Sequence, residues 1–159
     1  MSLDNKSCLC FSELPFEKCC QPILKGEQKA ANAKILMRSR FTAYVLKDYS
    51  YIFNTYAEAQ RLQLSVKELS QSAQSTDWLS LQMINHRAEL TSAQVEFKAY
   101  YKVDSGFYVM HELSEFILEN NSWRYTTGEM LESSGEIKPE RNCQCLCGSG
   151  KKFKKCCGK

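Results

Sequence analysis

The spacing of apolar residues along the first half of the chain predicts helices. From Ala30 to Lys47 the apolar residues recur at every third or fourth position, the spacing of one buried helical face, and Arg40 lies off that face. A second run with this period, residues 49–56, predicts a short helix. A third, residues 62–73, contains Ser65 where it would cap a helix start.

Beyond residue 77 the apolar period changes from about 3.6 to 2, which indicates a passage from helices to a sheet. Strands are expected at 79–83, 95–103, 107–118 and 123–127. Ser105–Gly106 and Asn120–Asn121 are predicted turns, and residues 128–140 are predicted to form an irregular linker. Helices followed by an antiparallel sheet indicate an α+β fold, with the helices packed on one face of the sheet.

Cysteines gather at the two ends of the chain. The spacing C-x-C-x(8)-C-C occurs at residues 8–20 and again at residues 145–157, where eight of thirteen positions are identical. Zinc binds four thiolates in a tetrahedron, so two close cysteine pairs joined by a reversing loop suit one ion. The predicted ligands are Cys8, Cys10, Cys19 and Cys20 in the first site, and Cys145, Cys147, Cys156 and Cys157 in the second.

The two cysteine loops differ at the positions where the backbone must reverse. Gly148 and Gly150 in the second loop accept positive φ angles, whereas Phe11 and Glu13 occupy the equivalent positions in the first. In both loops the last two cysteines are adjacent. Neighbouring side chains on a strand point to opposite faces, so we expect a turn or a helix start there.

Disulfide bonds are the alternative use of these cysteines. The chain opens Met-Ser-Leu-Asp-Asn-Lys without an apolar signal segment, from which we expect a reducing, cytoplasmic location. Clustered cysteines in that setting favour metal ligation over disulfides or redox chemistry. Cys143 lies outside the repeat and is interpreted as a spare thiol, with an alternative ligand or a redox-sensitive group as the other interpretation.

Charge is unevenly distributed along the chain. The formal net charge is +3, yet residues 141–159 carry six basic side chains and no acidic one. Such a tail attracts an acidic partner, protein or RNA, in a salt-dependent way, although the thiolates of zinc sites would reduce the net positive charge. No apolar run approaches the roughly 20 residues that a membrane span requires, so no span is expected.

Residues 141–157, with Arg-Asn before the second cysteine pattern and Gly-Ser-Gly-Lys-Lys-Phe-Lys-Lys within it, resemble the SEC-C motif. That motif is the zinc-binding tail of the translocation motor SecA, which contacts the chaperone SecB. The whole chain resembles the YchJ family from end to end. This resemblance rests on the SEC-C-like tail, the first cysteine loop, a Trp-containing last strand and the stretch Leu36-Met-Arg-Ser-Arg-Phe-Thr-Ala-Tyr44. The resemblance implies a cone-like middle domain of the nuclear transport factor 2-like (NTF2-like) type and no established activity. The expected units are residues 1–21, 28–130 and 141–159.

Our leading hypothesis is a zinc-binding protein-interaction module. The resemblance implies a secretion or quality-control partner, such as a SecB-like chaperone, and four lysines would supply charge complementary to an acidic patch on it. These are Lys151, Lys152, Lys154 and Lys155. Association of the basic tail with RNA or the ribosome is an alternative hypothesis.

A second alternative is a small-molecule site or an enzyme in the middle domain. If the sheet curves around a cavity, six ring side chains are candidates to line it: Tyr44, Tyr56, Trp78, Tyr101, His111 and Trp123. The enzyme hypothesis assigns acid–base roles to His111 and Glu112. The commoner use of such aromatic residues is to fill a core.

Overall fold

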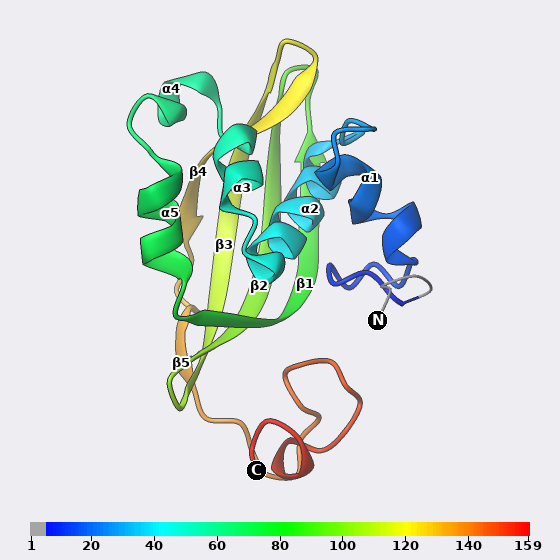
Figure 1. Ribbon diagram of the computed structural model, residues 1–159. Helices are drawn as coiled ribbons and strands as arrows, with labels where there is room; N and C mark the ends of the chain where they lie inside the picture. Colours follow the sequence, from blue (N-terminus) through cyan, green and yellow to red (C-terminus); the bar gives the residue numbers. More distant parts are fainter. Residues whose placement is uncertain (1–5) are drawn as a thin grey trace.

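The computed structural model describes residues 6–159, so the first five residues of the expected unit 1–21 lie outside the described residues. The described α-helices are α1 (Cys20–Leu24), α2 (Ala33–Leu46), α3 (Tyr49–Thr55), α4 (Glu58–Arg61) and α5 (Val66–Ala73). The strands are β1 (Thr76–Ala88), β2 (Ser92–Val103), β3 (Gly106–Glu119), β4 (Ser122–Met130) and β5 (Gly135–Ile137). Two short 3-10 helices, η1 (Phe16–Lys18) and η2 (Phe153–Lys155), lie within the cysteine loops. The helices gather on one face of an antiparallel sheet, which confirms the α+β prediction (Figure 1).

Helix α2 crosses the inner face of the sheet and lies between the sheet, α1 and α3 (Figure 1). It begins at a cap formed by Asn32, whose side chain accepts a hydrogen bond from the Ile35 amide at 2.9 Å. Eight of its fourteen residues are buried, so the prediction of one buried face was incomplete. Arg40, which lies off that face, is only 3% exposed because neighbours cover α2 on several sides.

Two of the helices that follow α2, namely α3 and α5, begin at side-chain caps. Asp48 accepts a hydrogen bond from the Tyr51 amide at the start of α3, and Ser65 accepts one from the Glu68 amide at the start of α5. The predicted Ser65 cap is therefore confirmed. Leu62, expected in the apolar stripe of this last helix, instead lies in the segment before it and is 83% exposed.

The sheet has the order β1-β2-β3-β4, and β5 pairs with the start of β3. Asn120 and Asn121 both have positive φ and form the predicted turn between β3 and β4. The turn before β3 lies at Asp104–Ser105, one residue earlier than predicted. The predicted irregular linker, residues 128–140, was partly wrong: β4 continues to Met130, and β5 adds backbone hydrogen bonds to the same edge of β3.

Two bulges interrupt β1, between Trp78 and Ser80 and again between Met83 and Asn85. The first bulge places Trp78 opposite Tyr101, on the inner face, and removes Leu79 from the predicted alternation with Leu81. Bulges bend a strand and increase its local twist, which suits the curled but unclosed sheet. The two-residue period of apolar positions in the sequence does not show where a bulge inserts an extra residue.

The main core lies between α2 and the sheet. It contains mainly apolar side chains from α2, β1, β2 and β3: Ala33, Leu36, Met37, Phe41, Leu81, Ala93, Val95, Phe97, Ala99 and Phe116. Within residues 6–159, none of the helices combines the length and the apolar character that crossing a bilayer would require.

Asn32→Ala is expected to lower the free energy of unfolding by about 1 kcal/mol, because the Ile35 amide at the start of α2 loses its acceptor. Urea denaturation followed by circular dichroism measures the loss. Asn32→Asp retains a capping oxygen and should stay near the original stability. A similar loss in both variants would contradict the cap.

Candidate metal centres and a central cavity

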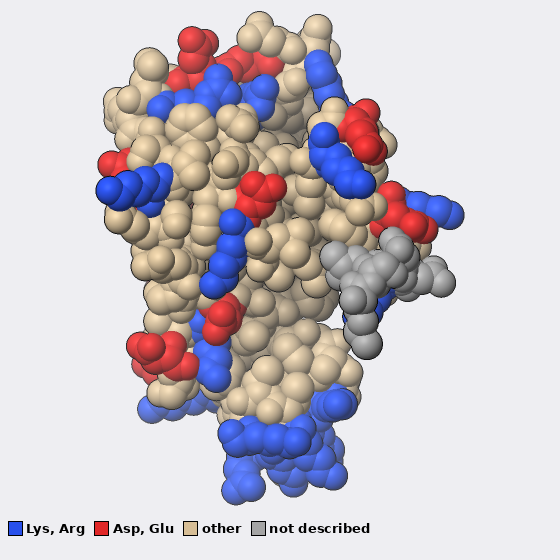
Figure 2. Space-filling view, in the orientation of Figure 1, with Lys and Arg blue, Asp and Glu red and all other residues tan. Residues whose placement is uncertain are grey.

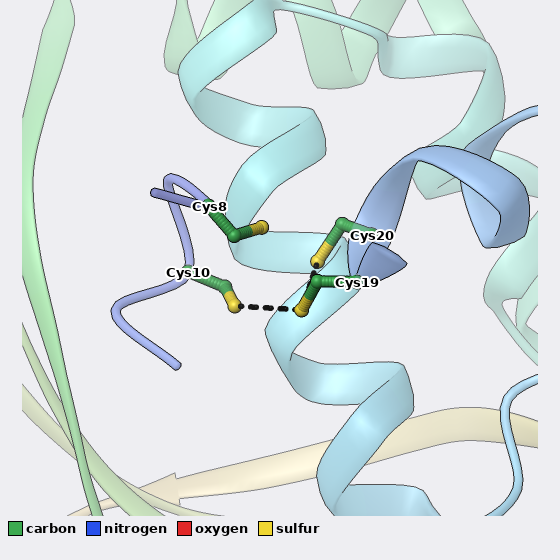
Figure 3. A group of neighbouring side chains, drawn as sticks. All are labelled: Cys8, Cys10, Cys19 and Cys20. Atoms are coloured by element: carbon green, nitrogen blue, oxygen red, sulfur yellow. Dashed lines mark hydrogen bonds between the residues drawn. The ribbon is translucent and has the colours of Figure 1, made fainter. Parts of the chain in front are cut away.

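The four cysteines of the first loop (residues 8–20) direct their sulfur atoms toward one point between the loop, α1 and α2 (Figure 3). All four Sγ atoms lie within 4.8 Å of one another. Cys10 Sγ lies 3.6 Å from Cys19 Sγ, which in turn lies 3.9 Å from Cys20 Sγ. A zinc ion about 2.3 Å from each sulfur would separate tetrahedral ligands by about 3.8 Å, so the four thiols could hold a metal ion.

The second loop (residues 145–157) forms a similar group. The Sγ atoms of its four cysteines also lie within 4.8 Å of one another, with 3.5 Å between Cys147 and Cys156. All these separations far exceed the roughly 2 Å of a disulfide, and every described cysteine is free. The disulfide alternative therefore does not describe this structure. Cys143 lies outside both groups, and its carbonyl accepts a hydrogen bond from the Phe153 amide.

The two loops have the same backbone hydrogen-bond frame. The Cys8 amide donates to the Leu14 carbonyl at 2.7 Å, as Cys145 does to Lys151 at 2.8 Å. In each loop a serine hydroxyl also contacts the third cysteine: Ser12 Oγ lies 3.1 Å from Cys19 Sγ, and Ser149 Oγ lies 3.4 Å from Cys156 Sγ. In each loop the third cysteine follows a 3-10 turn, and in the first loop α1 begins at Cys20, so the expected helix start is present.

Positive φ angles occur at equivalent positions of both loops. They are 75° and 79° at Gly148 and Gly150, and 64° and 68° at Phe11 and Glu13. A left-handed conformation costs a residue with a side chain about 1–2 kcal/mol, a cost that glycine avoids. The first loop therefore reaches the shape of the second against the preference of its own sequence.

Contacts with α2 support the strained first loop. Arg38 Nη1 donates a hydrogen bond to the Cys10 carbonyl at 2.7 Å, and the Thr42 hydroxyl lies 3.4 Å from Cys20 Sγ. Three of the four cysteines are buried there, whereas only Cys145 is buried in the second loop. Within the first group, a hydrogen bond from Cys20 to Cys10 lowers the pKa of Cys10 and raises the pKa of Cys20. A bound cation would replace this hydrogen bond.

The two loops also contact each other. The phenyl ring of Phe11 packs against Gly148, where an added Cβ would lie 2.5 Å from the ring. The same ring packs edge-on against Phe41 of α2 with a centroid distance of 6.3 Å. Phe11 therefore joins the first loop, the second loop and the core helix.

A separate cavity of about 380 Å³ lies between α2, α5 and the inner face of the sheet. Of the residues expected to line a pocket, Tyr44, Tyr56, Trp78 and Tyr101 do so. His111 and Trp123 do not. Trp123 packs beside the core, and His111 points to the opposite face of β3, where it contacts Glu96 and Ser133.

Of the two acid–base candidates of the enzyme hypothesis, only Glu112 therefore faces the cavity, because successive side chains on a strand point to opposite faces. Glu112 lies on the inner face and lines the cavity. Further polar residues there were missed, among them Arg40 and Tyr125. The sequence gives little indication that Arg40 is buried, since an arginine among apolar helix residues ordinarily reaches solvent.

Gly150→Ala tests the cost of the left-handed conformation alone, because an added Cβ would have no heavy atom within 4 Å. A cost of about 1–2 kcal/mol corresponds to roughly tenfold weaker metal affinity at the second loop. Competition with a chromophoric chelator measures that affinity.

Gly148→Ala should weaken metal binding further, because its Cβ also meets the Phe11 ring. In a Phe11→Ala background that ring is absent, and the cost of Gly148→Ala should fall to the cost of Gly150→Ala. If all these variants bind metal as tightly as the original chain, the backbone account of the loops is wrong.

Comparison with known proteins gives two family matches. Residues 32–128 match the model described as YchJ, middle NTF2-like domain, and residues 141–159 match the SEC-C motif. A UPF0225 protein of Vibrio cholerae is 37% identical over 154 residues, which cover 96% of this chain and 99% of the relative. A UPF0225 protein of Geobacter sulfurreducens is 35% identical over 156 residues, which cover 95% and 97%.

Two solved structures are similar over most of the chain. The crystal structure of a SEC-C motif containing protein from Psychrobacter arcticus has a TM-score of 0.70 at 34% identity and covers 99% of this chain and 98% of its own. The solution structure of a SEC-C motif containing protein from Rhodopseudomonas palustris has a TM-score of 0.76 at 29% identity and covers 80% and 100%. The NTF2-like fold, the SEC-C motif and the near full-length relatives together show that the chain belongs to the YchJ (UPF0225) family.

Proposed function

We propose that both cysteine groups bind zinc and that the second loop is a docking site for an acidic protein partner. Four thiolates complete the tetrahedral coordination of zinc and leave no position for a reacting water, so the metal has a structural role. The spacing of the sulfurs and the hydroxyls beside Cys19, Cys20 and Cys156 support this assignment. A bound ion would fix each loop in one shape.

The observation that carries the docking role is the position of four lysines between the cysteine pairs of the second loop. Figure 2 shows basic side chains concentrated over this end of the molecule. Lys151, Lys152 and Lys155 are exposed, and Lys154 is partly exposed. Metal binding at the cysteines would close the loop that carries these lysines, so it would hold the charges in a fixed arrangement.

The first loop has a different surface. Its residues equivalent to the four lysines are Leu14, Pro15, Glu17 and Lys18. Its cysteines are largely buried against α2, so its metal would mainly anchor the N-terminal segment to the domain. We therefore assign anchoring to the first loop and partner binding to the second.

An acidic protein surface is the partner that suits a rigid group of lysines, because complementary charge increases the rate and specificity of association. A SecB-like chaperone is our candidate, on the basis of the SEC-C motif at residues 141–159. The contact would be strongest at low salt, since exposed charges are screened within about 10 Å at 0.1 M ionic strength.

Metal removal by a chelator under reducing conditions is expected to increase amide hydrogen exchange in both cysteine loops while the central domain stays folded. Small loops with so few core residues depend on the ion for their shape. The first loop should retain more protection because Arg38 and Thr42 still contact it. Unchanged exchange in residues 145–157 after metal removal would contradict the structural role of the ion.

Reversing the exposed charges tests the docking role. Lys151→Glu, Lys152→Glu and Lys155→Glu combined should weaken binding to a purified SecB-like chaperone by at least about tenfold at low salt, because attraction becomes repulsion. The wild-type interaction should itself weaken with added salt. Surface plasmon resonance at two ionic strengths measures both effects.

Lys67→Glu, at an exposed position on α5, is the matched control and should leave chaperone binding unchanged. A single-stranded RNA oligonucleotide is the second probe. Binding that is insensitive to the triple charge reversal, or binding of the oligonucleotide without the chaperone, would reject the proposed partner.

A further inference from the structure

The central cavity is separate from both metal groups and has the size of a small-molecule site. Its volume of about 380 Å³ lies within the common range of ligand pockets, about 300–1,000 Å³. Ser72 and Met130 belong to its lining and are exposed, so the cavity opens to the surface. Much of the remaining wall is aromatic: Phe41, Tyr44, Tyr56, Trp78, Tyr101 and Tyr125.

One polar group at this cavity, the Glu112 carboxylate, is fixed in position by its neighbours. Glu112 is 9% exposed, and its Oε1 accepts a hydrogen bond from the Tyr125 hydroxyl. A Cβ at Gly128 would overlap the Glu112 carboxylate and come within 2.7 Å of the Tyr125 oxygen. Glycine weakens a strand interior, and here it leaves the space that the buried carboxylate occupies.

The charge of Glu112 is balanced by a second buried group on the same cavity. Arg40 donates hydrogen bonds to the Thr55 hydroxyl and the Ile52 carbonyl, and its guanidinium lies 4.4 Å from the centroid of the Tyr125 ring. Arg40 and Glu112 are not in direct contact but carry opposite charges beside one space. An ionic ligand would add an uncompensated charge to this buried region, which is costly, whereas a neutral ligand would not.

The cavity lining has unused hydrogen-bonding capacity of both kinds. Arg40 Nε and Trp78 Nε1 are buried donors without a partner within residues 6–159, and the Glu112 carboxylate is the charged acceptor. Among the described residues, the Tyr125 hydroxyl is the one hydrogen-bond donor to the Glu112 side chain. A carboxylate with two oxygens accepts several hydrogen bonds, so Glu112 can also accept one from a ligand. Burial raises the pKa of Tyr44 to about 12, and burial followed by the Glu112 charge raises the pKa of Tyr125, so both phenols stay protonated.

We infer that this cavity binds a small, neutral, flat aromatic molecule that carries an N–H or O–H donor, in the manner of an indole or a phenol. The donor bonds to the Glu112 carboxylate, and the ring lies among the aromatic side chains of α2, β1 and β2. Tyr125 and Gly128 position the carboxylate, and Arg40 balances its charge. This inference is independent of the metal sites and of their partner.

Indole is the test probe, and benzothiophene, with the same shape and no donor, is its matched analogue. Both are titrated into the ¹⁵N-labelled full chain and followed by NMR. Indole should shift the amides of lining residues such as Ala99 and bind at least about tenfold more tightly than benzothiophene, because only indole can donate a hydrogen bond to the charged carboxylate. Benzoate, an anion of similar size, should not bind.

Glu112→Gln should remove the preference for indole without reducing benzothiophene binding, since the amide keeps an oxygen for Tyr125 and places N–H groups toward the ligand. Glu96→Gln changes a glutamate on the opposite face of the sheet and should leave both affinities unchanged. Equal binding of indole and benzothiophene to the original chain would overturn the inference. Shifts confined to residues outside the cavity, or no shifts at millimolar probe, would also overturn it.

Discussion

The burial of α2 on several sides is the constraint on which the other parts of this structure depend. Residues Arg38 and Thr42 contact the first cysteine loop, while Phe41 packs against the sheet and Arg40 extends toward α3. A helix in this position cannot separate a buried face from a polar face. Its polar residues therefore need partners inside the protein, and these partners lie in the first cysteine loop and in α3.

The cysteine repeat shows how one backbone shape is reached with different sequences. The second loop has glycines at both left-handed positions, and its cysteines are less buried. The first loop has Phe11 and Glu13 there, and its contacts with α2 compensate for the strain. Strain of this kind persists where surrounding structure fixes the backbone. The Phe11 side chain also connects the two loops and α2, because its ring packs on both Phe41 and Gly148.

Much of the fold was predictable because most elements have an undisturbed period and a recognisable start or turn. Ser65 and Asn120–Asn121 are examples, and the cysteine spacing alone brought the eight ligand candidates together in two groups. The β1 bulges and β5 were missed, since they arise from pairing between distant segments. Arg40 and Tyr125 of the cavity were missed for a related reason: Arg40 is buried by contacts with Thr55 and Tyr125, which lie far from it in the sequence.

The first cysteine group and the cavity share α2, so a change in this helix affects both. Phe41 lines the cavity and contacts Phe11, and Arg40 and Thr42 lie on either side of it in sequence. A substitution that shifts the helix axis would disturb the support of the cysteine loop and the position of Arg40 together, because packed interiors transmit small displacements. The second loop contacts this assembly through Phe11 and through Phe153 against Phe107, and its lysines lie on the loop surface. These lysines can therefore change without altering the core, in keeping with the lower burial of the second cysteine group.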